Sequence, residues 1–133
     1  IIVQLILKKG FFAHLNRPPS FIENFDQLYQ IPGVELHHLH TFPSGHTQSA
    51  FLITFFLVLL LQNHKSLQII IPLIAVLVGV SRVYLLQHFL IDVWFGALIG
   101  FGLPYLTLYF LQKTGKYPLN DQSLSSYLKK SKA

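Results

Sequence analysis

The chain has 133 residues, of which 52% are hydrophobic and only 11% charged, so its composition excludes an ordinary soluble domain and indicates a membrane protein. The absence of cysteine excludes disulfides, thiolate metal ligands and a cysteine nucleophile. The net charge of +5 owes much to lysines after the last apolar run, which form no nucleic-acid-binding pattern, so we expect no nucleic-acid partner.

The first residues form an apolar run, Ile1 to Leu7, and the chain contains no methionine. We therefore expect residues 1–133 to be a single membrane-embedded domain of a longer chain, with this run as the end of a preceding membrane helix. Lys8, Lys9 and the pair Arg17-Pro18 follow the run. These cations could neutralise a phosphate at the membrane surface, whereas snorkelling toward the lipid headgroups is the alternative role for the lysines.

The next segment predicts a short amphipathic helix at the membrane surface. Ser20 to Glu23 fits a capping box, and Pro32-Gly33 would stop the helix. Apolar residues recur at helical spacing in this segment, namely Phe21, Ile22, Phe25, Leu28 and Tyr29. Such a helix could guide lipid substrates toward a site, or it could simply pack against its own protein.

A histidine run, His37, His38 and His40, raises the hypothesis of a metal site. The surrounding residues contain no zinc signature with a carboxylate, so we do not favour metal binding.

Three apolar segments follow, at about 44–61, 67–86 and 89–111, each close to the ~20 residues that cross a bilayer as a helix. The link from Gln62 to Ser66 is short and polar, so the first two spans are antiparallel. His64 and Lys65 then lie on the same side as the lysine-rich tail, residues 113–133, and the positive-inside rule makes that side cytoplasmic. The predicted fold is all-α, a transmembrane helical bundle with its candidate site at the opposite, non-cytoplasmic face.

Gly96 and Gly100 are four residues apart in the last span. A pair of small residues at this spacing lets another helix approach closely, either within the chain or between chains.

His88 and Asp92 are also four residues apart, so on a helix they share a face and the carboxylate can accept the Nδ1 proton of the imidazole. Nε2 is then free as a nucleophile, and the carboxylate stabilises positive charge on the ring as a bond forms. For an isolated pair, the alternative is a structural hydrogen bond at a helix start. Arg82 lies just upstream with a fork of donors that matches phosphate oxygens, although it could also anchor the chain at the headgroups.

Pro43-Ser44-Gly45-His46 stands where the first of the three spans should begin. Exposed backbone N–H groups at this helix start, with the Ser44 hydroxyl, would cradle an anion, and Gly45 would allow close approach. His46 is placed to protonate a leaving alkoxide. In isolation it would more often be a hydrogen-bonded interfacial histidine.

At these residues the chain resembles the type 2 phosphatidic-acid phosphatase superfamily, whose three-part pattern is KxxxxxxRP, PSGH and SRxxxxxHxxxD. The second and third parts match at every defined position: Pro43, Ser44, Gly45 and His46, then Ser81, Arg82, His88 and Asp92. The first part departs from the pattern, because the residue seven before Arg17 is Gly10. We take Lys9 as the lysine of this part because it is nearer than Lys8.

The resemblance implies a phosphatase with six membrane helices that needs no metal and no cofactor. It implies that His88 attacks phosphorus, that Asp92 supports it, and that His46 protonates the leaving group. It also implies that the phosphate is held by Lys9, Arg17, Ser44, Gly45 and Arg82.

The sequence therefore predicts an integral-membrane lipid phosphatase, expected in a bacterial inner membrane, whose partners are a lipid phosphate and the surrounding lipids. The alternatives are an enzyme like the related vanadium haloperoxidases, which are soluble, and a non-catalytic protein that binds or transports lipid phosphates. The identity of the lipid and the oligomeric state stay open.

Overall fold

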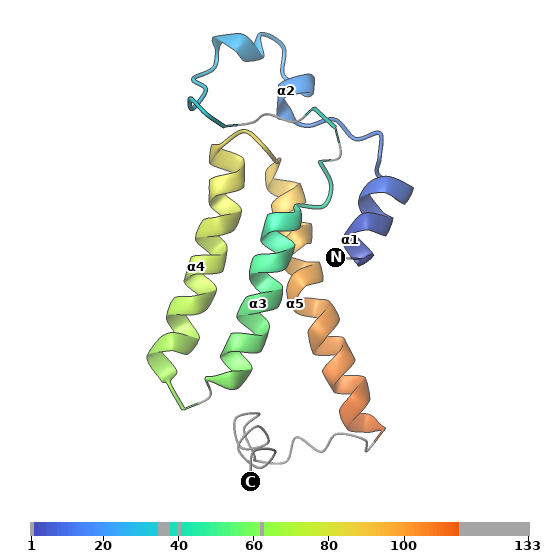
Figure 1. The fold of residues 1–133 in the computed structure, drawn as a ribbon, viewed down its shortest axis with the longest axis vertical. Coiled ribbons are helices and arrows are strands. Elements are labelled where there is room, and N and C mark those ends of the chain that lie inside the picture. Colours follow the sequence, from blue (N-terminus) through green and yellow to red (C-terminus); the bar gives the residue numbers. More distant parts are fainter. Residues whose placement is uncertain (1, 35–37, 40, 62, 115–133) are drawn as a thin grey trace.

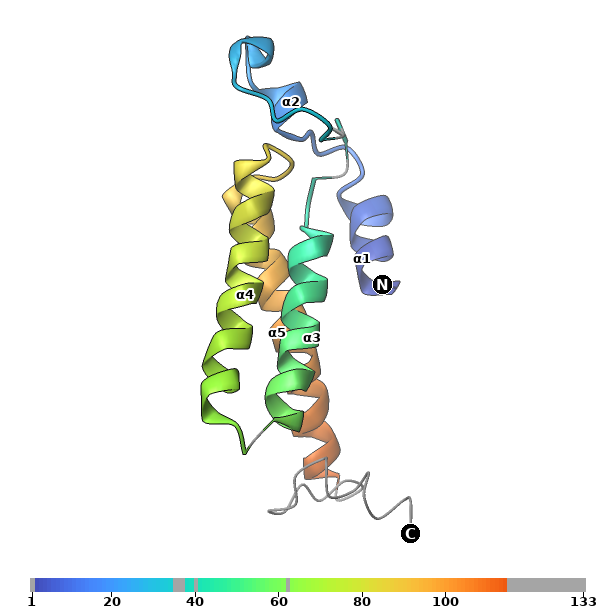
Figure 2. The ribbon, with the colours of Figure 1, turned by 60° about the vertical axis from the view of Figure 1, so that its left-hand side comes forward.

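The computed structural model describes residues 2–34, 38–39, 41–61 and 63–114. Three helices form a bundle: α3 (Gly45–Leu60), α4 (Lys65–Tyr84) and α5 (Leu90–Lys113) (Figure 1). A shorter helix, α1 (Ile2–Leu5), continues into a π-helical turn, Ile6–Phe11, and lies beside one end of the bundle (Figure 2). The described residues between this turn and α3, namely 12–34, 38–39 and 41–44, form a cap over the same end. The described residues are helical apart from loops and one isolated bridge, which confirms the all-α fold class.

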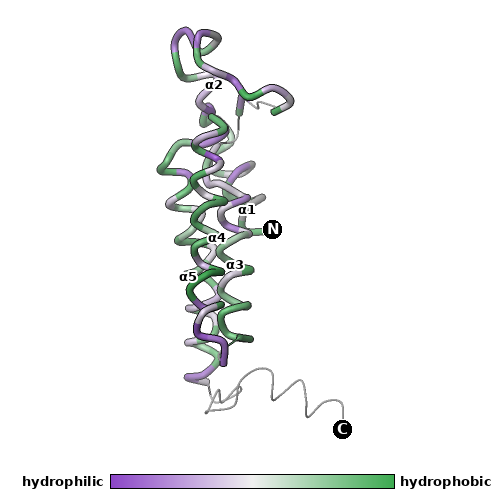
Figure 3. Tube along the Cα trace, turned by 90° about the vertical axis from the view of Figure 1, so that its left-hand side faces the viewer, coloured by the Kyte–Doolittle hydropathy of each residue, from purple (hydrophilic) through white to green (hydrophobic). Residues whose placement is uncertain are grey.

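The helices agree with the predicted spans to within a few residues. α4 and α5 are long and apolar enough to cross a membrane, whereas α3, with 16 residues, is shorter than the ~20 residues that a span requires. Little of α4 or α5 is buried within the chain, and both expose large apolar side chains along their length. Figure 3 shows these hydrophobic residues along the bundle. A helix that is apolar on its outer face as well as its inner face is typical of a lipid environment.

α3 packs against both other helices, and its more extensive contact is with α5. A Cβ on Gly96 would lie 2.6 Å from the carbonyl oxygen of Ser44, and a Cβ on Gly100 would clash with the carbonyl oxygen of Gln48. On α4, a Cβ on Gly79 would lie 2.8 Å from Val93 of α5. The pair Gly96 and Gly100 therefore serves a contact within this chain.

The predicted amphipathic helix is wrong. The segment contains only α2 (Pro18–Phe21) and a 3-10 turn, Phe25–Gln27. Pro18 and Pro19 start α2, but Ile22 is already extended and Asn24 has a left-handed conformation with φ 55°, which ends any continuous helix. Phe25, in the 3-10 turn, is buried instead of facing lipid.

Ring contacts join the cap to the bundle, and backbone hydrogen bonds join the two limbs of the cap. Phe42 contacts Phe12 and Phe95 edge to face, with ring centroids 4.7 and 5.0 Å apart. Within the cap, Arg17 N–H donates to the carbonyl oxygen of His38 at 2.9 Å, beside the bridge of Asn16 and Leu39. The cap thereby holds Arg17 over the bundle end. The predicted tail lies outside the described residues beyond Thr114.

Candidate active site

A cavity of about 570 Å³ lies at the bundle end beneath the cap. It is lined by residues of the π-helical turn, the cap, α3, α4 and the link between α4 and α5: Lys8, Arg17, Gly45, His46, Ser49, Ala50, Ile53, Val78, Gln87 and His88. Segments far apart in the sequence therefore meet at one hollow. Both motif histidines, His46 and His88, line it, as the topology predicted.

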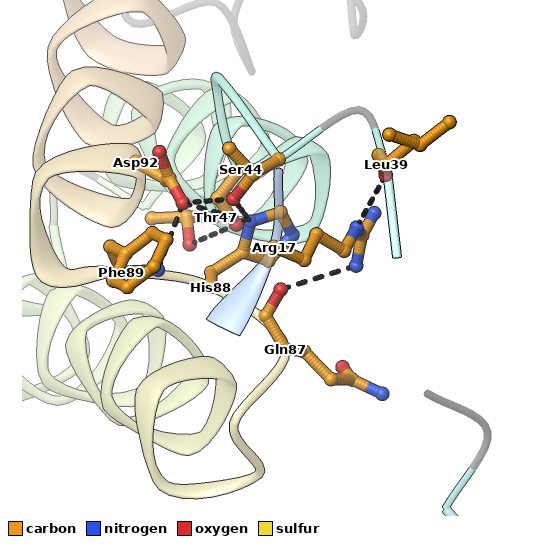
Figure 4. A network of polar contacts seen from close by, with 9 residues as sticks. Arg17, Leu39, Ser44, Thr47, Gln87, His88, Phe89 and Asp92 are labelled. Atoms are coloured by element: carbon orange, nitrogen blue, oxygen red, sulfur yellow. Dashed lines mark hydrogen bonds and ion pairs between the residues drawn. The ribbon is translucent and has the colours of Figure 1, made fainter. Parts of the chain in front are cut away.

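The first turn of α3 presents Gly45 and His46 to the cavity, but it does not present Ser44. Ser44 is fully buried, its N–H donates to the carbonyl oxygen of Asp92 at 2.9 Å, and its Oγ accepts from Thr47 Oγ1 at 2.9 Å (Figure 4). The Ser44 N–H and hydroxyl thus lie behind the cavity wall. The N–H joins α3 to α5 and the hydroxyl bonds within the first turn of α3, so neither forms the anion cradle that the sequence predicted for them.

The end of α4 is a Schellman motif that turns the chain toward the cavity. Leu86 N–H donates to the carbonyl oxygen of Val83 at 3.0 Å, and Gln87 N–H donates to that of Arg82 at 3.1 Å. Leu86 has a left-handed conformation with φ 54°, where glycine is more usual. This turn places Gln87 and His88 on the cavity wall immediately before α5.

His88 and Asp92 meet, although His88 precedes the helix and does not share a helical face with Asp92. Nδ1 of His88 lies 3.4 Å from Oδ2 of Asp92 (Figure 4). The same Oδ2 accepts the backbone N–H of Phe89 at 2.8 Å, which caps the start of α5. Asp92 therefore has both roles that the sequence left as alternatives, the helix-start hydrogen bond and the contact with the imidazole.

Burial lowers the pKa of His88 from its usual value. The hydrogen bond with Asp92 opposes this shift, while the positive charges of Arg17 and Lys8 add to it. The lowered pKa favours the neutral form of the ring, which is the form that a nucleophilic imidazole requires.

Thr41 is a site residue that the sequence analysis missed. Its Oγ1 donates to Asp92 Oδ2 and lies 3.5 Å from Nδ1 of His88, and only 3% of the residue is exposed. Its closeness in sequence to the Pro43–His46 motif was the one available signal. A threonine in a loop is too common for that signal to single it out.

Arg17 reaches the cavity from the cap with its guanidinium held on two sides. Nε donates to the carbonyl oxygen of Leu39 at 2.8 Å, and Nη1 donates to that of Gln87 at 3.2 Å (Figure 4). Burial lowers the pKa of Arg17, but a guanidinium stays charged. These contacts fix a positive charge close to His88.

The lysine that lines the cavity is Lys8. It lies in the π-helical turn, which an i to i+5 hydrogen bond from Phe12 N–H to the carbonyl oxygen of Leu7 closes at 2.9 Å. The side chain of Lys9 lies outside the part of the chain that the structure describes.

Arg82 stands behind the cavity wall. Its Nη1 donates to Oε1 of Gln87 at 2.9 Å, and Gln87 is the residue that lines the cavity. The Nε of Arg82 is buried with no hydrogen-bond partner among the described residues. The predicted phosphate-binding residues thus divide into Arg17 and Gly45 on the wall and Ser44 and Arg82 behind it.

Of the histidine run, His37 and His40 lie outside the described residues. His38 lies in the cap, where its Nδ1 is 2.9 Å from Oγ of Ser20.

The structure defines a class of protein in which an all-helical bundle carries, at one end, a cavity lined by two histidines, a lysine and an arginine. The chain belongs to the PAP2 superfamily, whose family model matches residues 1–116. This confirms the resemblance that the motifs predicted.

The chain is 41% identical over 85 residues to phosphatidylglycerophosphatase B of Bacillus subtilis (strain 168). That match covers 58% of this chain and 42% of the relative, so it spans less than half of the relative's length. No solved structure matches the chain.

Proposed function

We propose that this protein is an integral-membrane phosphatase that hydrolyses a phosphomonoester or diphosphate of a lipid through a phosphohistidine intermediate. The observation that carries the proposal is the shared cavity of His46 and His88, with Asp92 behind the His88 ring. The cations that line the same cavity match the negative charge of a phosphate.

In the proposed reaction, Nε2 of His88 attacks phosphorus, the bond from phosphorus to the lipid oxygen breaks, and His46 gives its proton to the leaving alkoxide. Asp92 stabilises the positive ring of the phosphohistidine. His46, now neutral, takes a proton from water, and the resulting hydroxide attacks phosphorus. The bond between phosphorus and Nε2 breaks, which releases inorganic phosphate and restores both histidines.

The phosphate would be held by Arg17 and the Gly45 N–H on the wall, and by a lysine, Lys9 in the motif or Lys8 in the cavity. Ser44 and Arg82 would act indirectly. Ser44 would hold the start of α3 against α5, and Arg82 would position Gln87 on the cavity wall. The residues already supply the positive charge and the nucleophile, so the proposal requires neither a metal nor a cofactor. Phosphate release that persists in EDTA would support this, and loss of activity in EDTA would contradict it.

The cavity also fits the lipid part of the substrate. Its walls include Ala50, Ile53 and Val78, so the hollow continues from the charged end along apolar parts of α3 and α4. Because the curated relative is a phosphatidylglycerophosphatase, a phosphatidylglycerol phosphate is the first substrate to test.

We place the site on the non-cytoplasmic face of a bacterial inner membrane. α4 begins at Lys65 and α5 ends at Lys113, both at the end of the bundle away from the cap (Figure 1). Basic residues outside the site thus favour that end as the cytoplasmic one. Labelling of an engineered cysteine at His64 from either side of sealed cells would test the orientation, and labelling from outside would reverse it.

The decisive experiment measures phosphate release by the protein expressed from its complete gene and purified in detergent. A panel of phosphorylated lipids is offered to the wild type and to His88→Ala and His46→Ala. His64→Ala is the matched control, because His64 is exposed at the far end of the bundle. We expect the first two variants to lose at least ~1000-fold in kcat and the control to keep wild-type activity. Retained activity in His88→Ala would exclude the mechanism.

A further inference from the structure

Thr41 lies near the end of the cap, contacts both His88 and Asp92, and is almost fully buried. Its Oγ1 has two polar neighbours across the site, Oδ2 of Asp92 and Nδ1 of His88. Its own N–H donates to the carbonyl oxygen of Leu15 at 3.4 Å, so the residue also joins the two limbs of the cap.

The hydroxyl of Thr41 has one proton and two lone pairs. An ionised carboxylate cannot donate, so the proton of Thr41 points to Asp92 Oδ2. A lone pair of Oγ1 is then available to the Nδ1–H of His88 at 3.5 Å. Nδ1 thus faces two oxygen acceptors, since Asp92 Oδ2 lies 3.4 Å from it.

Both contacts of Nδ1 are long for hydrogen bonds, so neither alone would hold the ring firmly. The carboxylate itself is held more tightly. Oδ2 accepts from Thr41 and from the N–H of Phe89 at 2.8 Å, two donors that come from different parts of the fold. These two bonds set where Oδ2 lies, and therefore whether it faces Nδ1 of His88.

We propose that Thr41 is a positioning residue whose hydroxyl holds the Asp92 carboxylate against Nδ1 of His88, so that Nδ1 keeps its proton and Nε2 stays free to attack phosphorus. The inference rests on the proposed phosphatase function and adds a residue that stands outside the matched motifs. Loss of the hydroxyl should slow the chemical step and leave substrate binding unchanged, because Thr41 does not line the cavity.

The test compares Thr41→Val, which removes the hydroxyl at similar size, with Thr41→Ser, which keeps it. In the protein from the complete gene, Thr41→Val should lower kcat by about 10- to 100-fold, as partners that orient a functional histidine commonly contribute. KM should change less than about twofold, and the rate of phosphohistidine formation should fall by the same factor as kcat. Thr41→Ser should stay within about threefold of the wild type.

Thr54→Val is the matched control, because Thr54 is a buried threonine of α3 that does not line the cavity. It should keep the wild-type kcat. If Thr41→Val does not fold, as judged by its thermal unfolding in detergent, Thr41→Ala replaces it with the same expected loss of kcat.

Three results would overturn the inference: wild-type kcat in Thr41→Val, a Thr41→Ser variant as slow as Thr41→Val, or a rise in KM without a change in kcat. The second would mean that the threonine methyl matters and not the hydroxyl. A wild type that releases no phosphate from any lipid would instead refute the proposed function.

Discussion

The backbone N–H of Ser44 donates to the carbonyl oxygen of Asp92 at 2.9 Å. This hydrogen bond joins the first turn of α3, which carries His46, to the first turn of α5, which follows His88. The distance between the two histidines therefore depends on how closely α3 and α5 approach. That approach is set by Gly96 and Gly100, whose missing side chains leave room for the carbonyl oxygens of α3.

A methyl group at this contact should separate the helices. We expect Gly96→Ala and Gly100→Ala each to destabilise the protein by about 1–3 kcal/mol and to lower phosphatase activity, because the new Cβ meets backbone that cannot rotate away. Gly102→Ala is the control, since nothing lies within 4 Å of its Cβ position. Thermal unfolding in detergent and phosphate release would check this. A Gly96→Ala variant as stable and active as Gly102→Ala would contradict it.

The activity should persist to lower pH than an ordinary histidine would allow. His88 must be neutral to attack, and burial lowers its pKa, so protonation removes the nucleophile only below the usual histidine value of about 6.5. The acid limb of kcat/KM against pH, measured with a phosphorylated lipid in detergent micelles, should accordingly lie below ~6.5. An acid limb above that value would mean that Asp92 raises the pKa of His88 more than burial lowers it.

The two lysines should differ in their effect on catalysis. Lys8 lines the cavity, where a lysine can neutralise the charge of a bound phosphate. We expect Lys8→Ala to lower kcat/KM by at least about tenfold and Lys9→Ala to lower it by less than about threefold. Measuring kcat/KM of both variants with the same lipid phosphate would test this prediction. A larger loss in Lys9→Ala than in Lys8→Ala would mean that Lys9 binds the phosphate, as the sequence analysis assigned.

The apolar end of the cavity should matter only for substrates with long chains. Ile53 follows His46 by two helical turns, about 10 Å along α3, and lines the same cavity. Ile53→Trp should lower hydrolysis of a long-chain lipid phosphate by about tenfold or more and spare a small water-soluble phosphate ester. Ile69→Trp is the control, because Ile69 is 66% exposed on α4 and does not line the cavity. Equal losses for both substrates would mean that the tryptophan disturbs the histidines and does not block a chain.

The three apolar runs, the short link at His64 and the spacing of the motifs are local properties of the sequence. They were enough to predict the helices, their antiparallel order and the meeting of His46 with His88, because helix length and loop length leave few ways to connect such segments. The composition of the 20–29 segment was misleading. Its apolar spacing suited a helix, but the left-handed Asn24 and the burial of Phe25 outweighed that preference.

Other features depend on how distant segments pack, and no local pattern encodes them. Ser44 faces inward because the Asp92 carbonyl takes its N–H, and Thr41 reaches the catalytic pair because the cap folds back over α5. Lys8 lies on the cavity wall because a π-helical turn sets its direction. The residue types and their order thus determined which chemistry this chain can carry. The fold decided which of those side chains line the cavity and which lie behind its wall, since direction and burial arise only when the segments are packed together.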